Sequence, residues 1–334
     1  MQWDVFCRVV DNHGDLGVCW RLVADLGARG EQVRLWVDDP RALAWMAPAG
    51  APGVAVVPWQ APLPDVTPGD VVVEAFGCNP PDAFVKRMAQ RRPVWINLEY
   101  LSAEPYVERS HGLPSPRPEG MKWFFYPGFT PATGGLLREP AWAGAATDPP
   151  WPQLGVEPRP GERRVSLFAY ADAPFADLFA RLDDRPTLLL LAAGASQAPA
   201  LAALQGRPRR HLRAAPLPWL TQPDYDRLLH ACDLNFARGE DSVVRAMWAG
   251  APFVWHIYRQ DDGAHAAKLD ALLDRQQAAP DVRSLWHAWN RLGPWAPSMP
   301  AEGPWREASR LWRAGLLAQA DLTTQLLQFV AAKR

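Results

Sequence analysis

The sequence has little of several features that mark other classes of protein. It contains only four cysteines, and their spacing fits no metal site, since they lie at Cys7, Cys19, Cys78 and Cys232. Their neighbours along the chain are apolar, so we expect four buried, reduced thiols. No apolar run approaches the roughly 20 residues that a membrane helix needs. A strand pattern begins almost at the first residue, which predicts no signal peptide and a cytoplasmic protein without a membrane partner.

The sequence also has almost no net charge and no glycine motif typical of dinucleotide binding. The 35 Lys and Arg residues nearly balance the 36 Asp and Glu residues, and the formal net charge is −1. Acids and bases are interspersed, which argues against a broad nucleic-acid footprint, so no nucleic-acid partner is expected. No glycine fingerprint with the usual dinucleotide spacing occurs. These absences argue against a protein built around a broad nucleic-acid footprint and against an ordinary dinucleotide enzyme.

The pattern that is present is an alternation of strands and helices, which predicts an α/β fold with parallel, doubly wound sheets. Strands are expected at residues 4–10, 32–37, 54–57, 70–76, 93–98, 165–168, 187–191, 234–236 and 253–256. Helices are expected at residues 18–26, 40–46, 81–90, 174–182, 224–231, 242–248 and 305–332.

The length of the chain predicts two domains, because 334 residues exceed one ordinary hydrophobic core. A Pro- and Gly-rich stretch from 102 to about 160 reads as irregular chain that shapes a site and links the domains. We therefore expect Rossmann-like domains at 1–155 and 160–315 with a cleft between them. The last segment, 316–334, is expected to cross back and brace the first domain.

The first strand leads into an unusual turn that carries two carboxylates four residues apart, Asp11 and Asp15. Ligands of parallel α/β sheets bind at the carboxyl ends of the strands, so this turn is a candidate site. Two acids there repel a phosphate, and they favour a cationic group, a proton transfer or a metal. The alternative is that one of them only caps the following helix, which is worth about 1 kcal/mol.

A second candidate site lies near residue 240, where a short strand leads into a helix. Arg238 and Gly239 precede good helix-capping residues, Asp241 and Ser242. Free N–H groups at a helix start, with an arginine beside them, form a phosphate site. Glu240 does not fit a phosphate site unless it meets a sugar hydroxyl or a second substrate. The alternative is a capped helix with an incidental ion pair.

These motifs carry a resemblance to a known family. The chain resembles the protein-arginine rhamnosyltransferases that modify bacterial elongation factor P, the EarP family. The similar segments run through most of the chain, at residues 11–22, 34–39, 97–101, 124–129, 233–242, 244–246 and 252–258. Two residues depart from the family pattern: His13 stands where a larger aromatic residue is expected, and Arg259 where proline is common.

The resemblance implies a GT-B glycosyltransferase that works by inversion, without a metal or another cofactor. The implied donor is dTDP-β-L-rhamnose, and the implied acceptor is one arginine of elongation factor P, which the modification activates to relieve ribosome stalling at polyproline. By resemblance Asp15 is the base, Asp11 orients the guanidinium and Glu240 helps to close the site. The acceptor-binding turn then comprises Asp11, Asn12, His13, Gly14 and Asp15.

The resemblance also implies a set of donor-binding residues. These are Phe168, Tyr170, Trp219, Gln222, Tyr225, Arg238, Gly239, Asp241 and Ser242. An aromatic stack and an amide suit a pyrimidine base. For Phe168 and Tyr225 the alternative is a purely structural place in the core.

Two other classes of function stay open from the sequence. One is a GT-B enzyme that acts on a lipid or a cell-wall sugar, although no basic amphipathic helix appears. The other is a non-catalytic nucleotide-sugar-binding protein, which would not need the acids of the first turn. The acidic pairs at 38–39 and 261–262 are read as turn or donor-side residues rather than metal ligands. His256 and His265 are read as sugar or phosphate contacts, or as structural histidines.

Overall fold

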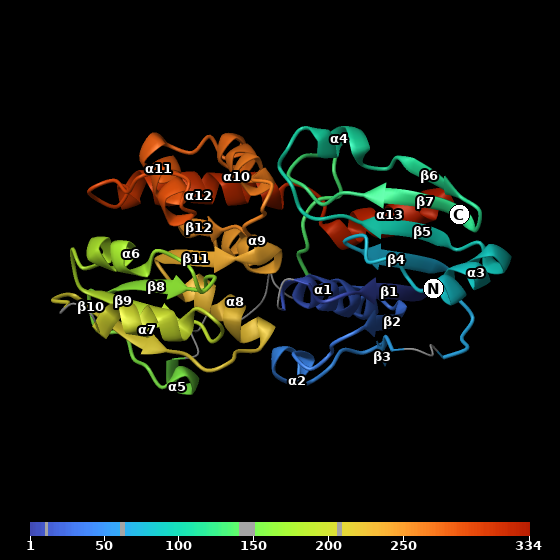
Figure 1. The fold of residues 1–334 in the computed structure, drawn as a ribbon, viewed down its shortest axis with the longest axis horizontal. Coiled ribbons are helices and arrows are strands. Elements are labelled where there is room, and N and C mark those ends of the chain that lie inside the picture. The colour runs from blue at the N-terminus through green and yellow to red at the C-terminus, as the bar shows by residue number, and fades with distance from the viewer. Residues whose placement is uncertain (11–12, 61–63, 140–150, 206–208) are drawn as a thin grey trace. The chain divides into compact units, whose positions relative to one another are not determined.

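The computed structural model describes residues 1–10, 13–60, 64–139, 151–205 and 209–334 (Figure 1). The chain forms two compact units. The first comprises Met1–Ala145 together with Leu317–Arg334, and the second comprises Ala146–Leu316. Each unit has its own sheet, so the fold is α/β with two Rossmann-like halves.

The first unit contains a seven-stranded sheet in the order β3-β2-β1-β4-β5-β7-β6. All neighbouring strands run parallel except β6 and β7, which form an antiparallel pair at one edge. The strands are β1 (Gln2–Cys7), β2 (Gln32–Val37), β3 (Val54–Pro58), β4 (Val71–Ala75), β5 (Val94–Leu98), β6 (Pro114–Arg117) and β7 (Gly120–Phe125). Its helices are α1 (Gly14–Ala28), α2 (Leu43–Met46), α3 (Asp82–Arg91), α4 (Tyr106–Ser110) and α13 (Leu322–Lys333).

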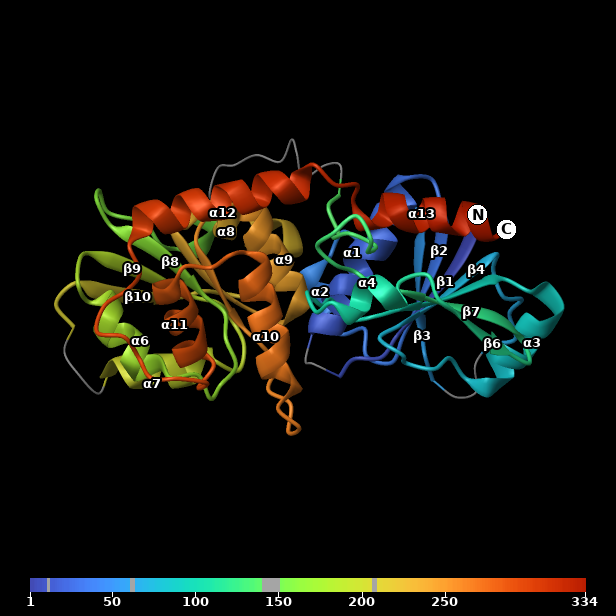
Figure 2. The same ribbon diagram turned by 90° about the horizontal axis from the view of Figure 1, so that it is seen from above.

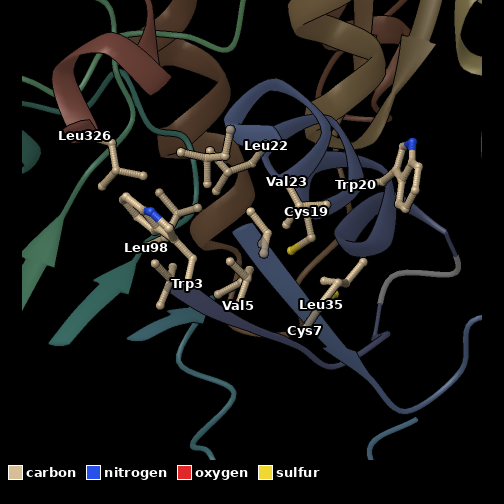
Figure 3. Close-up of a cluster of buried hydrophobic side chains, with 14 of the residues drawn as sticks. Trp3, Val5, Cys7, Cys19, Trp20, Leu22, Val23, Leu35, Leu98 and Leu326 are labelled. Carbon is tan, nitrogen blue, oxygen red and sulfur yellow. The ribbon is translucent and has the colours of Figure 1, made fainter. Parts of the chain in front are cut away.

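Helices cover both faces of this sheet because its central strands are apolar on both sides. Trp3, Val5 and Cys7 of β1 face α1 and α13, whereas Phe6 faces α3 in a separate cluster. Figure 3 shows the first of these clusters, with side chains of α1 and Leu326 of α13 meeting the sheet. Strands buried on both faces read as continuous apolar runs, which is why most of them were predictable.

The last helix of the chain is part of the first unit. Asp321 caps α13 by accepting from the backbone N–H of Thr324 at 2.8 Å. Arg29 at the end of α1 pairs with Asp321 at 2.8 Å and donates to the Thr324 hydroxyl at 2.7 Å. Because Leu326 is fully buried in the α1 cluster, α13 contributes directly to this core.

The second unit contains a five-stranded, fully parallel sheet in the order β10-β9-β8-β11-β12 (Figure 1; β8, β9 and β10 are also labelled in Figure 2). The strands are β8 (Arg163–Leu167), β9 (Thr187–Leu191), β10 (Leu212–Pro216), β11 (Leu234–Arg238) and β12 (Phe253–His256). The helices are α5 (Trp151–Leu154), α6 (Phe175–Leu182), α7 (Gln197–Gln205), α8 (Gln222–Ala231), α9 (Gly239–Ala249), α10 (Ala264–Arg275), α11 (Pro280–Trp289) and α12 (Glu302–Leu317). Leu228 of α8 packs on Leu188 and Leu190, and Trp289 of α11 packs against Phe236 with ring centroids 4.9 Å apart.

The structure corrects several expectations about these elements. The stretch from 102 to 160 is not uniformly irregular, because β7 lies in it and extends the parallel sheet beside β5. This strand is hidden in the sequence by Lys122, a charged residue that is buried because it pairs with the buried Glu74. The expected helix at 305–332 is two helices, separated where Asp321 starts α13. The strand expected at 4–10 ends at Cys7.

Candidate functional site

The carboxylate of Asp15 lies at the carboxyl end of β1, in the first turn of α1. Its Oδ2 accepts from the backbone N–H of Val10 at 2.9 Å, and the residue is only 4% exposed. Asp11 and Asn12 lie outside the described residues. The N-cap residue of α1 is His13, without a side-chain capping bond, and Gly14 is the first helical residue. Asp15 is therefore not the N-cap of this helix, although it sits at the positive end of the helix dipole.

The neighbouring acids at 38 and 39 have structural partners. Asp38 accepts from the backbone N–H of Val9 at 3.0 Å and from that of Asp39 at 3.0 Å, so it ties the end of β2 to the turn after β1. A hydrogen bond from Arg41 lowers the pKa of Asp39 to about 2. No group of three or more His, Cys, Asp or Glu side chains that could hold a metal occurs among the described residues.

In the second unit, Arg238 at the end of β11 has an unusual environment for a charged group. It is 7% exposed, and its guanidinium lies over the rings of Phe168 and Tyr170, 4.4 and 4.9 Å from their centroids. Its Nη1 is buried and has no hydrogen-bond partner among the residues that the structure describes. A buried cation without a carboxylate partner is unfavourable unless an anion binds there.

The start of α9 lies immediately beside Arg238. Gly239 has a φ of +64°, a left-handed conformation that glycine adopts most readily, and its carbonyl accepts from the Trp255 indole at 3.0 Å. This bend brings Asp241 and the buried Ser242 into the first turn of the helix. Arg238, the N–H groups that start α9 and the Ser242 hydroxyl together form an arrangement suited to a diphosphate.

The remaining donor candidates gather near Phe168, which follows β8. The rings of Phe168 and Tyr225 meet edge to face at 5.9 Å. A Cβ on Gly194 would lie 3.7 Å from the Phe168 ring and 3.8 Å from the ring of Trp219, so this glycine lies against both aromatic residues. The structure therefore brings Phe168, Trp219 and Tyr225 together from separate segments. Gly194 was missed, because a single glycine in a loop carries no sequence signal.

Gln222 and Tyr225 share the first turn of α8, which Thr221 caps by accepting from the Asp224 N–H at 3.2 Å. Gln222 is buried. Burial raises the pKa of the Tyr225 hydroxyl, with a smaller opposing effect from Ser242. This places the base-binding candidates of α8 close to the first turn of α9.

Glu240 makes an ion pair that the sequence did not indicate. Its Oε1 lies 2.8 Å from Nζ of Lys268 on α10, and both side chains are largely buried. Lys268 also lies 5.8 Å from the Trp255 ring centroid. Lys268 is far from Glu240 in the sequence, so only the packing of α10 near α9 reveals the pair. Glu240 and Asp15 belong to different units.

His256 supports the aromatic residue next to Arg238. Its Nδ1 accepts from the backbone N–H of Tyr170 at 3.2 Å, and the two rings lie 5.1 Å apart. Burial lowers the pKa of His256 to about 4. Tyr258 also packs against Tyr170, with ring centroids 5.7 Å apart. This neighbour of the site was not singled out from the sequence. His265 instead accepts from the Gln260 N–H at 3.2 Å, and Asp262 accepts from the Ala264 N–H at 3.0 Å.

Replacing His256 should change how the stability of the protein depends on pH. Below about pH 6.5 the unfolded chain binds a proton at this histidine, and the folded chain does not until about pH 4. Its contribution to stability is therefore complete above pH 6.5 and declines as the pH falls, by up to about 1.4 kcal/mol per pH unit. We expect His256→Asn, whose side-chain oxygen replaces Nδ1, to remove this part of the slope in denaturant unfolding between pH 4 and 8.

A second variant of the same residue serves as the control. His256→Gln places its amide further out and should fail to hold the Tyr170 N–H. An unchanged slope in folded His256→Asn would show that this histidine does not stay neutral in the folded protein.

Comparison with known proteins gives one consistent result. A family model described as elongation factor P (EF-P) rhamnosyltransferase EarP matches residues 3–331. A protein-arginine rhamnosyltransferase from Pseudomonas aeruginosa is 42% identical, with 99% of each chain covered. The protein-arginine rhamnosyltransferase of Neisseria meningitidis serogroup B is 33% identical over 98% of this chain and 96% of its own.

Solved structures agree with the sequence comparisons. A structure of EarP, reported for EarP-mediated arginine glycosylation of translation elongation factor EF-P, matches with a TM-score of 0.68 and 32% identity. That match covers 100% of this chain and 99% of the other. The glycosyltransferase VinC in complex with dTDP matches with a TM-score of 0.58 at 14% identity over the whole of both chains, which shows a shared GT-B fold. In the described part of the chain, no helix is both long and apolar enough to span a membrane.

Proposed function

The chain belongs to the EarP family of elongation factor P rhamnosyltransferases, and on this premise we propose that it transfers L-rhamnose from dTDP-β-L-rhamnose to one arginine side chain, with inversion and without a metal. It is a glycosyltransferase of the protein-arginine class. The acceptor is elongation factor P, whose modification we propose to take place in the cytoplasm and to relieve ribosome stalling at polyproline. The observation that carries the donor side of this proposal is the buried Arg238, which lacks an anionic partner within the described residues.

The second unit is proposed to bind the donor. The diphosphate would meet Arg238, Ser242 and the N–H groups that start α9, where the helix dipole favours negative charge. Arg238 would then stabilise the charge that develops on the departing dTDP. The aromatic surface of Phe168 and Trp219 offers a stacking partner for the thymine ring.

The first unit is proposed to bind and deprotonate the acceptor. A guanidinium has a pKa above about 12 and delocalised lone pairs, so it is a poor nucleophile. The Asp15 carboxylate would localise its charge on one nitrogen. As that nitrogen attacks the anomeric carbon, the carbon–oxygen bond to dTDP breaks and one N–H proton passes to Asp15. Asp11, which is not among the described residues, is proposed to orient the guanidinium.

Glu240 is proposed to approach the reacting groups from the donor-binding unit. Its pairing with Lys268 fixes the carboxylate beside the first turn of α9 and reduces its repulsion of the diphosphate. The carboxylate oxygens of Glu240 can accept hydrogen bonds, which suits a contact to a sugar hydroxyl or to the acceptor guanidinium.

Gln222 is proposed to read the thymine base. Replacing Gln222 by alanine should reduce the preference for dTDP over other nucleoside diphosphates by roughly tenfold, since a lost amide–base pairing costs about 1–1.5 kcal/mol. Transfer should continue at saturating donor. Competition of dTDP, UDP and GDP for the donor site measures this effect, with Gln205→Ala, at the exposed end of α7, as the control. Equal selectivity in Gln222→Ala and wild type would remove Gln222 from base recognition.

The proposed reaction is tested by intact-mass measurement of elongation factor P after incubation with the protein and dTDP-rhamnose. We expect one added deoxyhexose, confined to one arginine, and none on an acceptor in which lysine replaces that arginine. Chelator should leave the rate unchanged, and nuclear magnetic resonance of the product should show the inverted anomer. A wild-type protein that binds dTDP-rhamnose but leaves elongation factor P unmodified would contradict the proposal.

A further inference from the structure

The carboxyl edge of the first sheet continues past the Asp15 turn. Strands β1, β4, β5 and β7 are parallel neighbours in that order, so their carboxyl ends lie side by side. At about 4.8 Å between strands, the row from β1 to β7 spans roughly 14 Å. The residues that directly follow the last three strands are Phe76, Glu99 and Tyr126.

Two pairs of aromatic residues lie along this row of strand ends. Phe76 and Tyr100 stack with ring centroids 4.3 Å apart and planes 13° apart. Tyr106 of α4 meets Tyr126 edge to face at 5.8 Å. Tyr100 is 39% exposed and Tyr106 is 40% exposed. Exposed rings of this size on a folded surface are typical of a recognition site rather than of a core.

The same surface also carries a carboxylate residue, Glu99, which directly precedes Tyr100 in the chain. Glu99 continues the sheet by donating its N–H to the Phe125 carbonyl at 2.9 Å, and its Oε1 accepts from the Asn97 amide at 2.5 Å. Burial, Glu99 and Tyr106 together raise the pKa of Tyr126 to about 12, which places Glu99 close to the second aromatic pair. The Tyr126 hydroxyl therefore stays protonated at neutral pH.

In the first aromatic pair, the backbone of Phe76 has an unfavourable conformation. Phe76 has a φ of +57°, a left-handed conformation that is rare for a bulky residue. Its N–H donates to the Leu98 carbonyl at 2.7 Å, and Asn97 Oδ1 accepts from the next residue, Gly77, at 3.1 Å. Asn97 is buried, and it thus holds the Phe76 turn and the Glu99 side chain at the same time. Strained backbone of this kind is concentrated at functional sites.

We propose that Phe76, Glu99, Tyr100, Tyr106 and Tyr126, here called the aromatic shelf, form the docking surface for the segment of elongation factor P that carries the target arginine. The proposal rests on the proposed function, which makes that segment the occupant. Such a segment brings at least one positive charge, and a carboxylate among tyrosine rings is the chemistry that holds a guanidinium or ammonium group and its aliphatic stem. Because β4 is the direct neighbour of β1, the shelf begins one strand away from the Asp15 turn.

The shelf is tested by measuring the dissociation constant for unmodified elongation factor P in the absence of donor. We expect Tyr100→Ala and Tyr106→Ala each to weaken binding roughly tenfold, as truncated aromatic anchors do. Glu99→Gln keeps an acceptor for Asn97 but loses the charge, and it should weaken binding about fivefold at low salt and less at high salt. In transfer assays the loss should appear in KM for elongation factor P, with kcat at saturating acceptor and the dTDP affinity near wild type.

Two controls lie at the opposite, amino end of β7. Met121→Ala removes an apolar side chain that is also exposed, and Glu119→Gln removes a charge outside the shelf. Both should bind elongation factor P like wild type. Near-ultraviolet circular dichroism shows whether the shelf variants fold. If folded shelf variants bind elongation factor P as tightly as these controls, the proposed docking surface is wrong. Rhamnose transfer by the wild-type protein would still support the proposed function in that case. Shelf variants with weakened binding would uphold the surface even if the modified arginine proved different from the one expected.

Discussion

Replacing Asp15 by asparagine should slow rhamnose transfer at least about a hundredfold while leaving the folded protein and its donor affinity intact. The loss of a general base typically lowers a rate by about 10² to 10⁴. Asparagine keeps the shape of the side chain, and its oxygen still accepts from the Val10 N–H that Asp15 Oδ2 binds at 2.9 Å. It loses the charge that holds a guanidinium and the basicity that takes its proton.

This substitution separates catalysis from a structural role at the helix start. As helix-terminal groups, aspartate and asparagine are about equal hydrogen-bond acceptors, so a structural role predicts little change. Single-turnover transfer at saturating donor and acceptor measures the chemical step, and thermal melting and dTDP calorimetry report the fold and the donor site. Asp39→Asn is the matched control, because Asp39 lies nearby on the same edge and pairs with Arg41. That control should transfer rhamnose at the wild-type rate.

If Asp15→Asn transfers rhamnose at a near-normal single-turnover rate, the base lies elsewhere, and Asp11 and Glu240 become the next residues to replace. Asp11→Asn is expected to show more of its defect in acceptor binding, because its proposed role is to orient the guanidinium. Equal defects of Asp15→Asn and Asp39→Asn would point to a general disturbance of the turn.

Replacing Arg238 by alanine should weaken the binding of dTDP-rhamnose and of dTDP alike, by roughly 10- to 100-fold. A lost charge-assisted contact to a phosphate is worth about 1.5–3 kcal/mol. Arg238 makes no ion pair within the described chain, so no buried carboxylate is left unpaired by its removal. The expected loss of stability is limited to its contacts with the Phe168 and Tyr170 rings.

Calorimetry with dTDP, dTMP and dTDP-rhamnose measures this prediction. The defect should be larger for dTDP than for dTMP, because Arg238 is assigned to the diphosphate and not to the base. Arg238→Lys restores the charge without the planar fork and should recover part of the affinity. The exposed Arg310→Ala on α12 is the control for a general loss of positive charge. Unchanged dTDP affinity in a folded Arg238→Ala protein would exclude Arg238 from the donor site.

The amino-acid sequence alone predicted the α/β class and most of the strands that position the site. The segments 32–37 and 187–191 were predicted with the bounds of β2 and β9. The strand β9 is buried throughout and is a nearly continuous apolar run, whereas β2 was visible from its apolar residues on either side of the half-buried Arg34. The family was also recognisable from the sequence, because its chemically unusual motifs consist of consecutive residues. Asp15 at a strand end and Arg238 at a helix start were likewise predictable, because both positions follow from the order of the elements.

Only the tertiary structure decided the features that depend on residues far apart in the chain. Lys122 hid β7 because its buried partner, Glu74, is a residue of another strand. Lys268 pairs with Glu240 from a different helix, and Gly194 meets Phe168 and Trp219 from a different loop. Likewise α13 joins the first core through Leu326, although it is the last helix of the chain. Periodicity and capping are properties of neighbouring residues, whereas each of these contacts arises only when the sheet sets distant segments side by side.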